Sequence, residues 1–295
     1  MKILLTGKNG QVGFELQRAL APLGEVIAVD HQECDLADAS AIRKLVAEVS
    51  PQIIVNPAAY TAVDKAESES ELAFAINAKA PGIFGEEAEK IGASVIHFST
   101  DYVFDGTKLG SYSEDDPTNP QSVYGRSKRD GELALRESGA RHLIFRTSWV
   151  VGAHGANFAK TMLRLAADRD SLSVVADQYG APTSAALLAD VTAQVMRQQQ
   201  REGSTGFPYG TYHLVAGGET NWCDYARFVI DAAIKAGKPM KATQESITPI
   251  VTAQYPTPAR RPANSRLNTQ RFRQTFGLEL PHWQDGLSHI LHQIL

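Results

Sequence analysis

Short runs of apolar residues alternate with segments of helical periodicity through the first half of the chain. The apolar runs have the length of buried strands and fall at residues 2–6, 26–29, 53–55, 95–98 and 143–145. Between several of them, apolar side chains recur at the spacing of one helix face, at residues 11–23, 39–49 and 69–91. Strands that are apolar throughout and separated by helices are typical of a parallel sheet covered on both faces. The pattern therefore predicts an α/β fold with a Rossmann-type, doubly wound parallel sheet.

The periodicity is less regular after about residue 150. It predicts helices at 157–167 and 185–199, a strand at 172–175 and a flexible loop at 203–206. Residues 247–264 are rich in proline and include aromatic and basic side chains, which suits a shaped binding loop at least as well as a linker. We therefore expect a dinucleotide-binding domain at residues 1–150. Residues 151–295 should form a smaller, mainly substrate-binding region, with some elements returning to the first domain.

Composition limits the classes of function. The 295 residues are 43% hydrophobic, which is enough for a sizeable core, and the net charge of -4 gives no indication of a nucleic-acid partner. No stretch approaches the roughly 20 apolar residues of a membrane span, and the N-terminal apolar run is too short for a signal peptide. Two cysteines are too few for a disulfide framework or a zinc site. These features favour a cytoplasmic protein without a membrane partner.

A glycine-rich turn connects the first predicted strand to the first predicted helix. Gly7, Gly10 and Gly13 give the spacing G-x-x-G-x-x-G, which lets the backbone approach a pyrophosphate at a helix N-terminus. Asp30 ends the second strand, where a carboxylate accepts hydrogen bonds from the adenosine ribose. Asp30 alone favours NADH, whereas Lys8 could offset its charge, so the sequence leaves NADPH and NADH open.

A tyrosine and a lysine four residues apart suggest acid catalysis. Tyr124 and Lys128 lie at positions i and i+4, which share one face of a helix. A lysine ammonium favours the phenolate and lowers a tyrosine pKa that starts near about 10. Such a tyrosine can protonate the alkoxide that forms when a carbonyl accepts a hydride. Thr100 follows the strand at 95–98, so its hydroxyl should lie at the carboxyl edge of the sheet, where this fold binds ligands.

These motifs resemble those of the extended short-chain dehydrogenases/reductases and, more narrowly, the family of dTDP-4-dehydrorhamnose reductases, over nearly the whole chain. The family features are the glycine turn, Asp30, Asn77, the Tyr124–Lys128 pair and the segments NPAA (56–59), TAVDKAE (61–67), STDYVF (99–104), RTSWV (146–150), NFAKT (157–161), DQYGAPT (177–183) and TPARRP (257–262). The resemblance implies reduction of the C4 keto group of dTDP-4-dehydro-L-rhamnose to dTDP-L-rhamnose with NADPH or NADH. A dTDP-sugar is the implied partner.

The resemblance also implies individual roles. Tyr124 would protonate the C4 oxygen, Lys128 would lower the pKa of Tyr124 and hold the nicotinamide ribose, and Thr100 would orient the substrate oxygen. Further cofactor contacts are implied for Gly10, Gln11 and Val12 at the pyrophosphate, Asp35 and Leu36 near the adenine, and Ala58, Ala59 and Tyr60 beside the cofactor. Asp101 and Trp149 would face the sugar. Because arginine forks match phosphate oxygens, we also expect Arg260 or Arg261 to bind the diphosphate.

Two points of the resemblance concern assembly and reaction type. Some relatives are metal-linked dimers; Glu15 and Asp190 are present here, but Ala186 stands where a glutamate is expected. We therefore predict no metal site, regard magnesium as doubtful, and leave a homodimer open. Another nucleotide-sugar reductase or an epimerase of the same fold, and a non-catalytic NADP-binding regulatory subunit, are the alternative functions. A dehydratase is disfavoured because Asp101 is followed by Tyr102 rather than an acidic residue.

Overall fold

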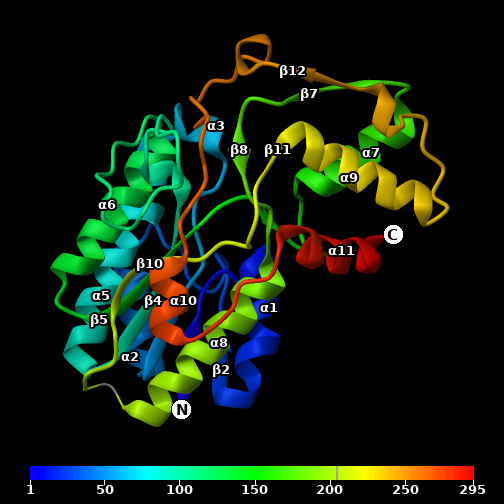
Figure 1. Ribbon diagram of the computed structural model, residues 1–295. Helices are drawn as coiled ribbons and strands as arrows, with labels where there is room; N and C mark the ends of the chain where they lie inside the picture. The colour runs from blue at the N-terminus through cyan, green and yellow to red at the C-terminus, as the bar shows by residue number, and fades with distance from the viewer. Residues whose placement is uncertain (204) are drawn as a thin grey trace.

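A six-stranded sheet lies at the centre of the molecule. The computed structural model describes residues 1–203 and 205–295; Ser204, in the loop predicted at 203–206, lies outside the described residues. All neighbouring strands are parallel, in the order β10-β5-β4-β3-β1-β2 (Figure 1). Their bounds are β1 Lys2–Leu5, β2 Glu25–Ala28, β3 Ile53–Asn56, β4 Ser94–Thr100, β5 Arg141–Thr147 and β10 Gly210–His213. The predicted α/β fold with a doubly wound parallel sheet is confirmed.

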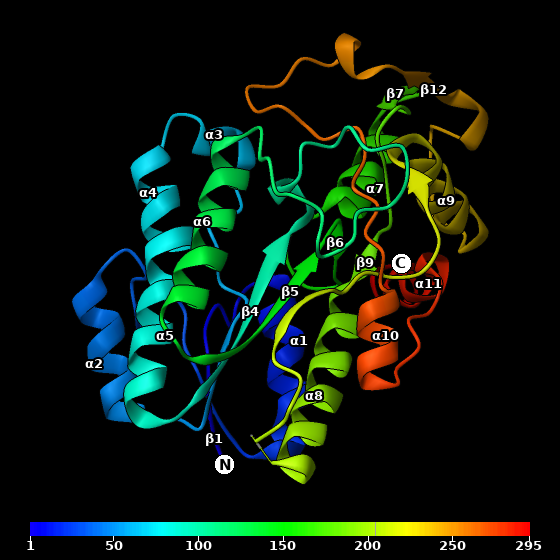
Figure 2. The same ribbon diagram turned by 60° about the vertical axis from the view of Figure 1, so that its left-hand side comes forward.

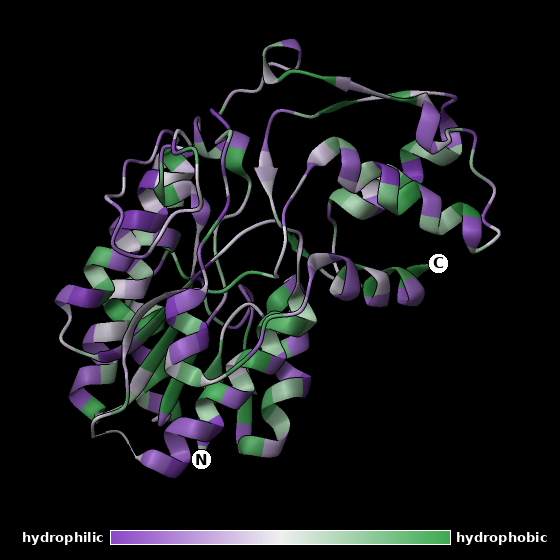
Figure 3. Cartoon of the chain, viewed as in Figure 1, coloured by the Kyte–Doolittle hydropathy of each residue, from purple (hydrophilic) through white to green (hydrophobic). Residues whose placement is uncertain are grey.

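Helices cover both faces of this sheet, as Figure 2 shows. One layer contains α1 (Gln11–Leu20), α8 (Ala185–Glu202) and α10 (Gln270–Phe276), and the other contains α2 (Ala39–Val49), α5 (Ala80–Ile91) and α6 (Val123–Glu137). Successive strand residues alternate between the layers: Ile3 and Leu5 pack toward α1 and α8, whereas Leu4 packs toward α2 and α5. Figure 3 shows the resulting hydrophobic strands between helices of mixed polarity. Burial on both faces explains why the strands are apolar throughout.

The helix predicted at 69–91 is divided. The chain forms α4 (Ser70–Phe74), a π-helical turn at Ala75–Lys79, and then α5. Pro81 has no N–H to offer the carbonyl of Asn77, and α6 approaches that carbonyl at Gly131. The Asn77 side chain accepts from Tyr60 N (2.8 Å) and donates to Tyr60 O (3.1 Å) and Ser127 Oγ (3.0 Å). Hydrophobic periodicity does not reveal such a turn, because its cause is tertiary packing.

The second half of the chain contributes to two cores. A separate core joins α7 (Phe158–Asp168), α9 (Trp222–Lys235) and α11 (Trp283–Ile294) with the parallel pair β7 (Leu172–Val175) and β12 (Ile247–Ile250). This group stands apart at the upper right of Figure 1. By contrast, β10, α8 and α10 pack with the central sheet. No helix among the described residues combines the length and apolar character needed to cross a bilayer.

Short elements connect these parts. Strand β6 (Val150–Val151) pairs with β9 (Thr183–Ser184), and β8 (Tyr179–Gly180) pairs with β11 (Thr220–Asn221). The proline-rich stretch starts as β12 and then returns toward the sheet domain, where Ala259 N donates to Oδ1 of Asp64 (3.2 Å), a residue of α3 (Val63–Ala66). The stretch therefore connects the two parts of the molecule.

The close approach of α6 to the π-helical turn can be tested at one glycine. A Cβ on Gly131 would lie 2.0 Å from Asn77 O. We expect Gly131→Ala to lower the free energy of unfolding by about 2 kcal/mol, because overpacking against backbone exceeds the roughly 1 kcal/mol gain in helix propensity. Urea unfolding measures this difference. Gly110→Ala is the matched control, since a Cβ there meets nothing within 4 Å; equal stability of the two variants would contradict the packing argument.

Candidate active site

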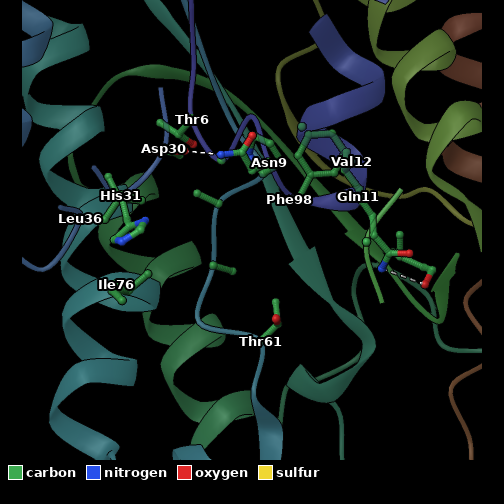
Figure 4. Close-up of a pocket in the computed structure, with 18 of the residues that line it drawn as sticks. Thr6, Asn9, Gln11, Val12, Asp30, His31, Leu36, Thr61, Ile76 and Phe98 are labelled. Carbon is green, nitrogen blue, oxygen red and sulfur yellow. Dashed lines mark hydrogen bonds between the residues drawn. The ribbon is translucent and has the colours of Figure 1, made fainter. Parts of the chain in front are cut away.

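A cavity of about 550 Å³ opens at the carboxyl ends of the central strands. Residues that follow β1, β2 and β3 line it, together with residues of β4, α1 and α6. Strand order reverses between β1 and β3, and doubly wound sheets bind ligands at such a reversal. Figure 4 shows Asp30, His31, Leu36 and Ile76 toward one end of the cavity, with Gln11, Val12 and Phe98 toward the other.

The glycine turn forms one wall of this cavity. Gly7 has a left-handed φ of +62°, and a Cβ on Gly13 would lie 2.0 Å from Gly7 O. The turn therefore closes tightly only without side chains at these positions. Gly10 precedes α1 and provides no side-chain cap, so the first backbone N–H groups of the helix are available to a ligand. All three predicted glycines, with Gln11 and Val12, border the cavity.

Asp30, predicted to contact the adenosine ribose, lines the cavity. It accepts hydrogen bonds from the Asn9 side chain and from Gln32 N (2.8 Å to Oδ1) (Figure 4). Lys8, which could offset its charge, pairs with Glu33, and both acidic residues raise the pKa of Lys8. Asp30 thus keeps a carboxylate at the end of β2, where a ribose would meet it.

The remaining predicted cofactor residues divide into two groups. Asp35, Leu36, Ala58 and Ala59 line the cavity. Tyr60 does not: Asn77 holds its backbone, and its hydroxyl donates to Glu69 Oε2 (2.5 Å).

Several lining residues were not predicted from the sequence: His31, Ile76, Thr147, Val150, Gly155 and Ala156. Thr147 could have been found, because it follows the strand predicted at 143–145 and ends β5 at the carboxyl edge of the sheet. Gly155 and Ala156 come from the loop after β6, which the sequence does not mark. That loop is held to the start of α1 by Gln11 Oε1, which accepts from Gly152 N (2.8 Å) and Asn157 Nδ2 (3.0 Å).

The first two turns of α6 bring the predicted acid and lysine to the cavity. Ser122 caps the helix by accepting from Gly125 N (3.1 Å), and Tyr124 and Lys128 then lie on one face and line the cavity. Thr100 ends β4; its hydroxyl donates to Asp101 Oδ1 (3.0 Å) and lies close enough to the Tyr124 side chain to act on its pKa. Thr100 itself is buried behind the lining formed by Phe98 and Ser99. The three residues are therefore brought together at one place.

The protonation states differ from the sequence expectation. Burial raises the pKa of Tyr124 to about 12, against the opposing effect of the nearby Thr100 hydroxyl, so Lys128 does not lower it as predicted. Lys128 Nζ donates to Phe98 O (2.6 Å) and lies 3.2 Å from His97 Nε2. Burial lowers the pKa of Lys128 to about 7, despite the nearby Glu132. Desolvation disfavours the phenolate and the ammonium alike, so the pKa of Tyr124 is raised, against the expected direction, and that of Lys128 is lowered.

Two predicted sugar contacts lie beyond this lining. Burial raises the pKa of Asp101 to about 6, although the Thr100 hydroxyl donates a hydrogen bond to its Oδ1 (3.0 Å). Trp149 has a left-handed φ of 49°, which is costly for a bulky side chain. Its indole stacks on Trp222 at a centroid distance of 3.7 Å, and Gly180 packs against its edge.

The two predicted phosphate ligands also lie outside the cavity lining. Arg261 Nη2 pairs with Asp64 Oδ2 (2.8 Å), and Arg260 Nη1 donates to Gln121 Oε1 (3.4 Å). Both contacts join the proline-rich stretch to the sheet domain.

The acidic residues considered for a metal are joined by an arginine. Arg18 pairs with Glu15 (3.3 Å) and with Asp190 (2.9 Å). Across residues 1–203 and 205–295, no group of three or more His, Cys, Asp or Glu side chains is arranged to hold a metal ion.

The lowered pKa of Lys128 predicts a pH dependence of stability. The folded value of about 7 lies below the ordinary value of 10.5, so between these pH values the unfolded chain binds a proton that the folded chain does not. Wild-type stability should therefore rise with pH across this window relative to Lys128→Met, by at most about 1.4 kcal/mol per pH unit. Urea unfolding between pH 7 and pH 9 tests this. Lys44→Met is the control, because Lys44 is exposed. If the free energies of unfolding of the wild type and Lys128→Met differed by the same amount at every pH, the prediction would be contradicted.

The whole chain is similar to known proteins of one family. One family model, described as the RmlD substrate binding domain, matches residues 1–295. The dTDP-4-dehydrorhamnose reductase of Escherichia coli K12 is 52% identical over 298 residues, covering 100% of this chain and 98% of that protein. The crystal structure of a Clostridium acetobutylicum dTDP-4-dehydrorhamnose reductase has a TM-score of 0.90 and 37% identity, and one from Bacillus anthracis in complex with NADP has 0.88 and 35%; both cover 99% of each chain. The resemblance found in the motifs is therefore confirmed, and the chain belongs to the dTDP-4-dehydrorhamnose reductase family.

Proposed function

We propose that this oxidoreductase uses NADPH or NADH to reduce the C4 keto group of dTDP-4-dehydro-L-rhamnose, giving dTDP-L-rhamnose. The main observation behind the proposal is that one cavity is lined both by the glycine turn and by Tyr124 with Lys128. Relatives along the full length of the chain are named for this reaction. A binding-only role is disfavoured because the tyrosine and the lysine are both present and both face the cavity.

The cavity fits a reduced nicotinamide dinucleotide. Uncapped N–H groups at the start of α1 suit a pyrophosphate, and the Asp30 carboxylate suits ribose hydroxyls. Asp35 and Leu36 would contact the adenine, and Ala58 and Ala59 would lie along the cofactor, with Tyr60 supporting them through its backbone. When bound, the cofactor supplies the hydride that reduces the substrate carbonyl.

Tyr124 is suited to donate the proton that completes the reduction. Its pKa of about 12 keeps the phenol protonated near neutral pH, so a proton is available when the C4 oxygen becomes an alkoxide. Thr100, whose hydroxyl lies beside Tyr124, would orient that oxygen. Lys128, one turn along α6, would stabilise the phenolate left behind whenever its amine is protonated, and would hold the nicotinamide ribose.

The substrate would extend from this site toward the second half of the chain. Asp101 and Trp149 would face the sugar, and Arg260 or Arg261 would bind the diphosphate. Arg261 is paired with Asp64, so it would have to exchange that carboxylate for a phosphate group of the substrate. We accordingly assign cofactor binding mainly to residues 1–150 and substrate binding mainly to 151–295, with β10, α8 and α10 returning to the sheet.

Location and assembly complete the proposal. We place the protein in the cytoplasm, where its two free, buried cysteines would stay reduced, and propose no nucleic-acid partner. A homodimer would form without a magnesium link, because Arg18 already neutralises Glu15 and Asp190.

A coupled assay tests the proposed reaction. The two upstream activities convert dTDP-glucose to dTDP-4-dehydro-L-rhamnose, and absorbance then follows oxidation of NADPH or NADH. We expect oxidation only with the complete upstream mixture. Cofactor binding without oxidation would move the substrate to another keto sugar or the protein to a regulatory role.

Removing one hydroxyl tests the role of Tyr124. Because Tyr124→Phe deletes only the acidic proton, we expect kcat to fall by at least about 1000-fold while cofactor binding, followed by fluorescence, stays within a few fold. Tyr209→Phe is the control, since that hydroxyl contacts Gln199 away from the cavity. Retained turnover in Tyr124→Phe would remove Tyr124 from the mechanism.

A further inference from the structure

A line of buried polar side chains runs beneath the cavity and ends on Lys128. Thr6 Oγ1 lies 2.6 Å from Asn56 Oδ1, Asn56 Nδ2 lies 3.2 Å from His97 Nδ1, and His97 Nε2 lies 3.2 Å from Lys128 Nζ. All four side chains are at most 2% exposed. They come from the ends of β1 and β3, the middle of β4 and the second turn of α6. Buried polar groups of this kind must satisfy one another.

The contacts of Lys128 define the direction of its amine. A protonated amine has three N–H donors. Phe98 O accepts one at 2.6 Å, and His97 Nε2 is placed to accept a second at 3.2 Å. Because Lys128 also borders the cavity, its third N–H is left for the ligand side. His97 thus helps to decide which way the ammonium points.

This acceptor role requires one tautomer of His97. A protonated Lys128 can only donate, so its 3.2 Å contact with His97 Nε2 requires a lone pair on Nε2. The proton of the neutral ring is then on Nδ1, which faces the side-chain amide of Asn56 at 3.2 Å. The Asn56 amide can turn its oxygen toward Nδ1–H, and the Thr6 hydroxyl, which donates or accepts, satisfies either orientation.

The surrounding charges keep His97 neutral. Burial and the neighbouring Lys128 hold its pKa well below the usual range. The other charged group near Lys128 is Glu132, one turn further along α6, and Arg146 of β5 binds it through Nε (2.8 Å) and Nη2 (2.6 Å). Glu132 also accepts from Ser99 Oγ (2.6 Å) and pairs with Arg136 (3.0 Å), so its carboxylate is engaged away from the amine.

We propose that His97 is a positioning residue for the reduction: as the neutral Nδ1–H tautomer, it accepts a hydrogen bond from the Lys128 ammonium and directs that ammonium toward the cavity. The proposal rests on the roles assigned above to Tyr124 and Lys128. Thr6, at the other end of the line, borders the same cavity as Lys128.

Two substitutions at position 97 separate positioning from packing. His97→Leu removes the acceptor, and we expect kcat to fall by about 10- to 100-fold, because hydrogen bonds to charged groups are worth that factor. Without the acceptor the ammonium is less stable, so the alkaline limb of the kcat profile should move to lower pH by about one unit. His97→Gln, whose side-chain oxygen can reach the same point, should recover kcat to within a few fold. A folded His97→Leu enzyme with wild-type kcat and pH profile would overturn the proposal.

Nuclear magnetic resonance of the ¹⁵N-histidine-labelled wild-type protein gives an answer that does not depend on turnover. The His97 signals are assigned as those missing from His97→Gln. At pH 6, where Lys128 is mainly protonated, Nδ1 should carry the proton and Nε2 should not. A proton on Nε2, in a neutral ring or an imidazolium, would overturn the proposal even if His97→Leu failed to fold. Turnover by Tyr124→Phe or Lys128→Met would instead refute the roles assigned in the proposed function.

Discussion

The reversal of strand order between β1 and β3 is the constraint on which the site depends. The chain moves from β1 to β2 on one side and to β3, β4 and β5 on the other, and all these strands end at the same edge. The segments that follow β1 and β3 therefore separate and leave a crevice. One wall of the crevice is the backbone at Gly7 and Gly13, where there is no room for a Cβ. Another wall is formed by the Tyr124 and Lys128 side chains of α6. Because both faces of the sheet are covered, this edge is where a dinucleotide can reach several strands at once.

Burial then sets the chemistry at the inner end of the crevice. Helix α6 packs so closely that Gly125 and Gly131 touch the backbone carbonyls of Tyr102 and Asn77. Tyr124 and Lys128 are drawn out of water as a result, and each is shifted toward its neutral form. A neutral phenol is the form that a reductase needs before the hydride is transferred. A charged lysine is needed afterwards, so the polar contacts that favour its ammonium matter for turnover.

The sequence predicted features that depend on local spacing. The strand, glycine turn and helix at residues 2–23 are adjacent in the chain, and Tyr124 and Lys128 share a helix face whatever surrounds them, so both groups were placed correctly. Features set by distant contacts were not found. Examples are Gly155 at the cavity, the π-helical turn at Asn77 and the pairing of Arg261 with Asp64. The direction of the Tyr124 pKa shift was missed for the same reason, since spacing shows that a lysine is near a tyrosine but not how deeply both are buried.

Isotope transfer tests the central claim most directly. The enzyme is given dTDP-4-dehydro-L-rhamnose and NADPH carrying deuterium at C4 of the nicotinamide, prepared separately with the label on each face. Proton magnetic resonance then locates the label in the sugar. Transfer of hydride to the C4 carbonyl predicts one deuterium at C4 of dTDP-L-rhamnose, from only one of the two labelled cofactors. Deuterium at another carbon, or an unlabelled product from both cofactors, would contradict the account.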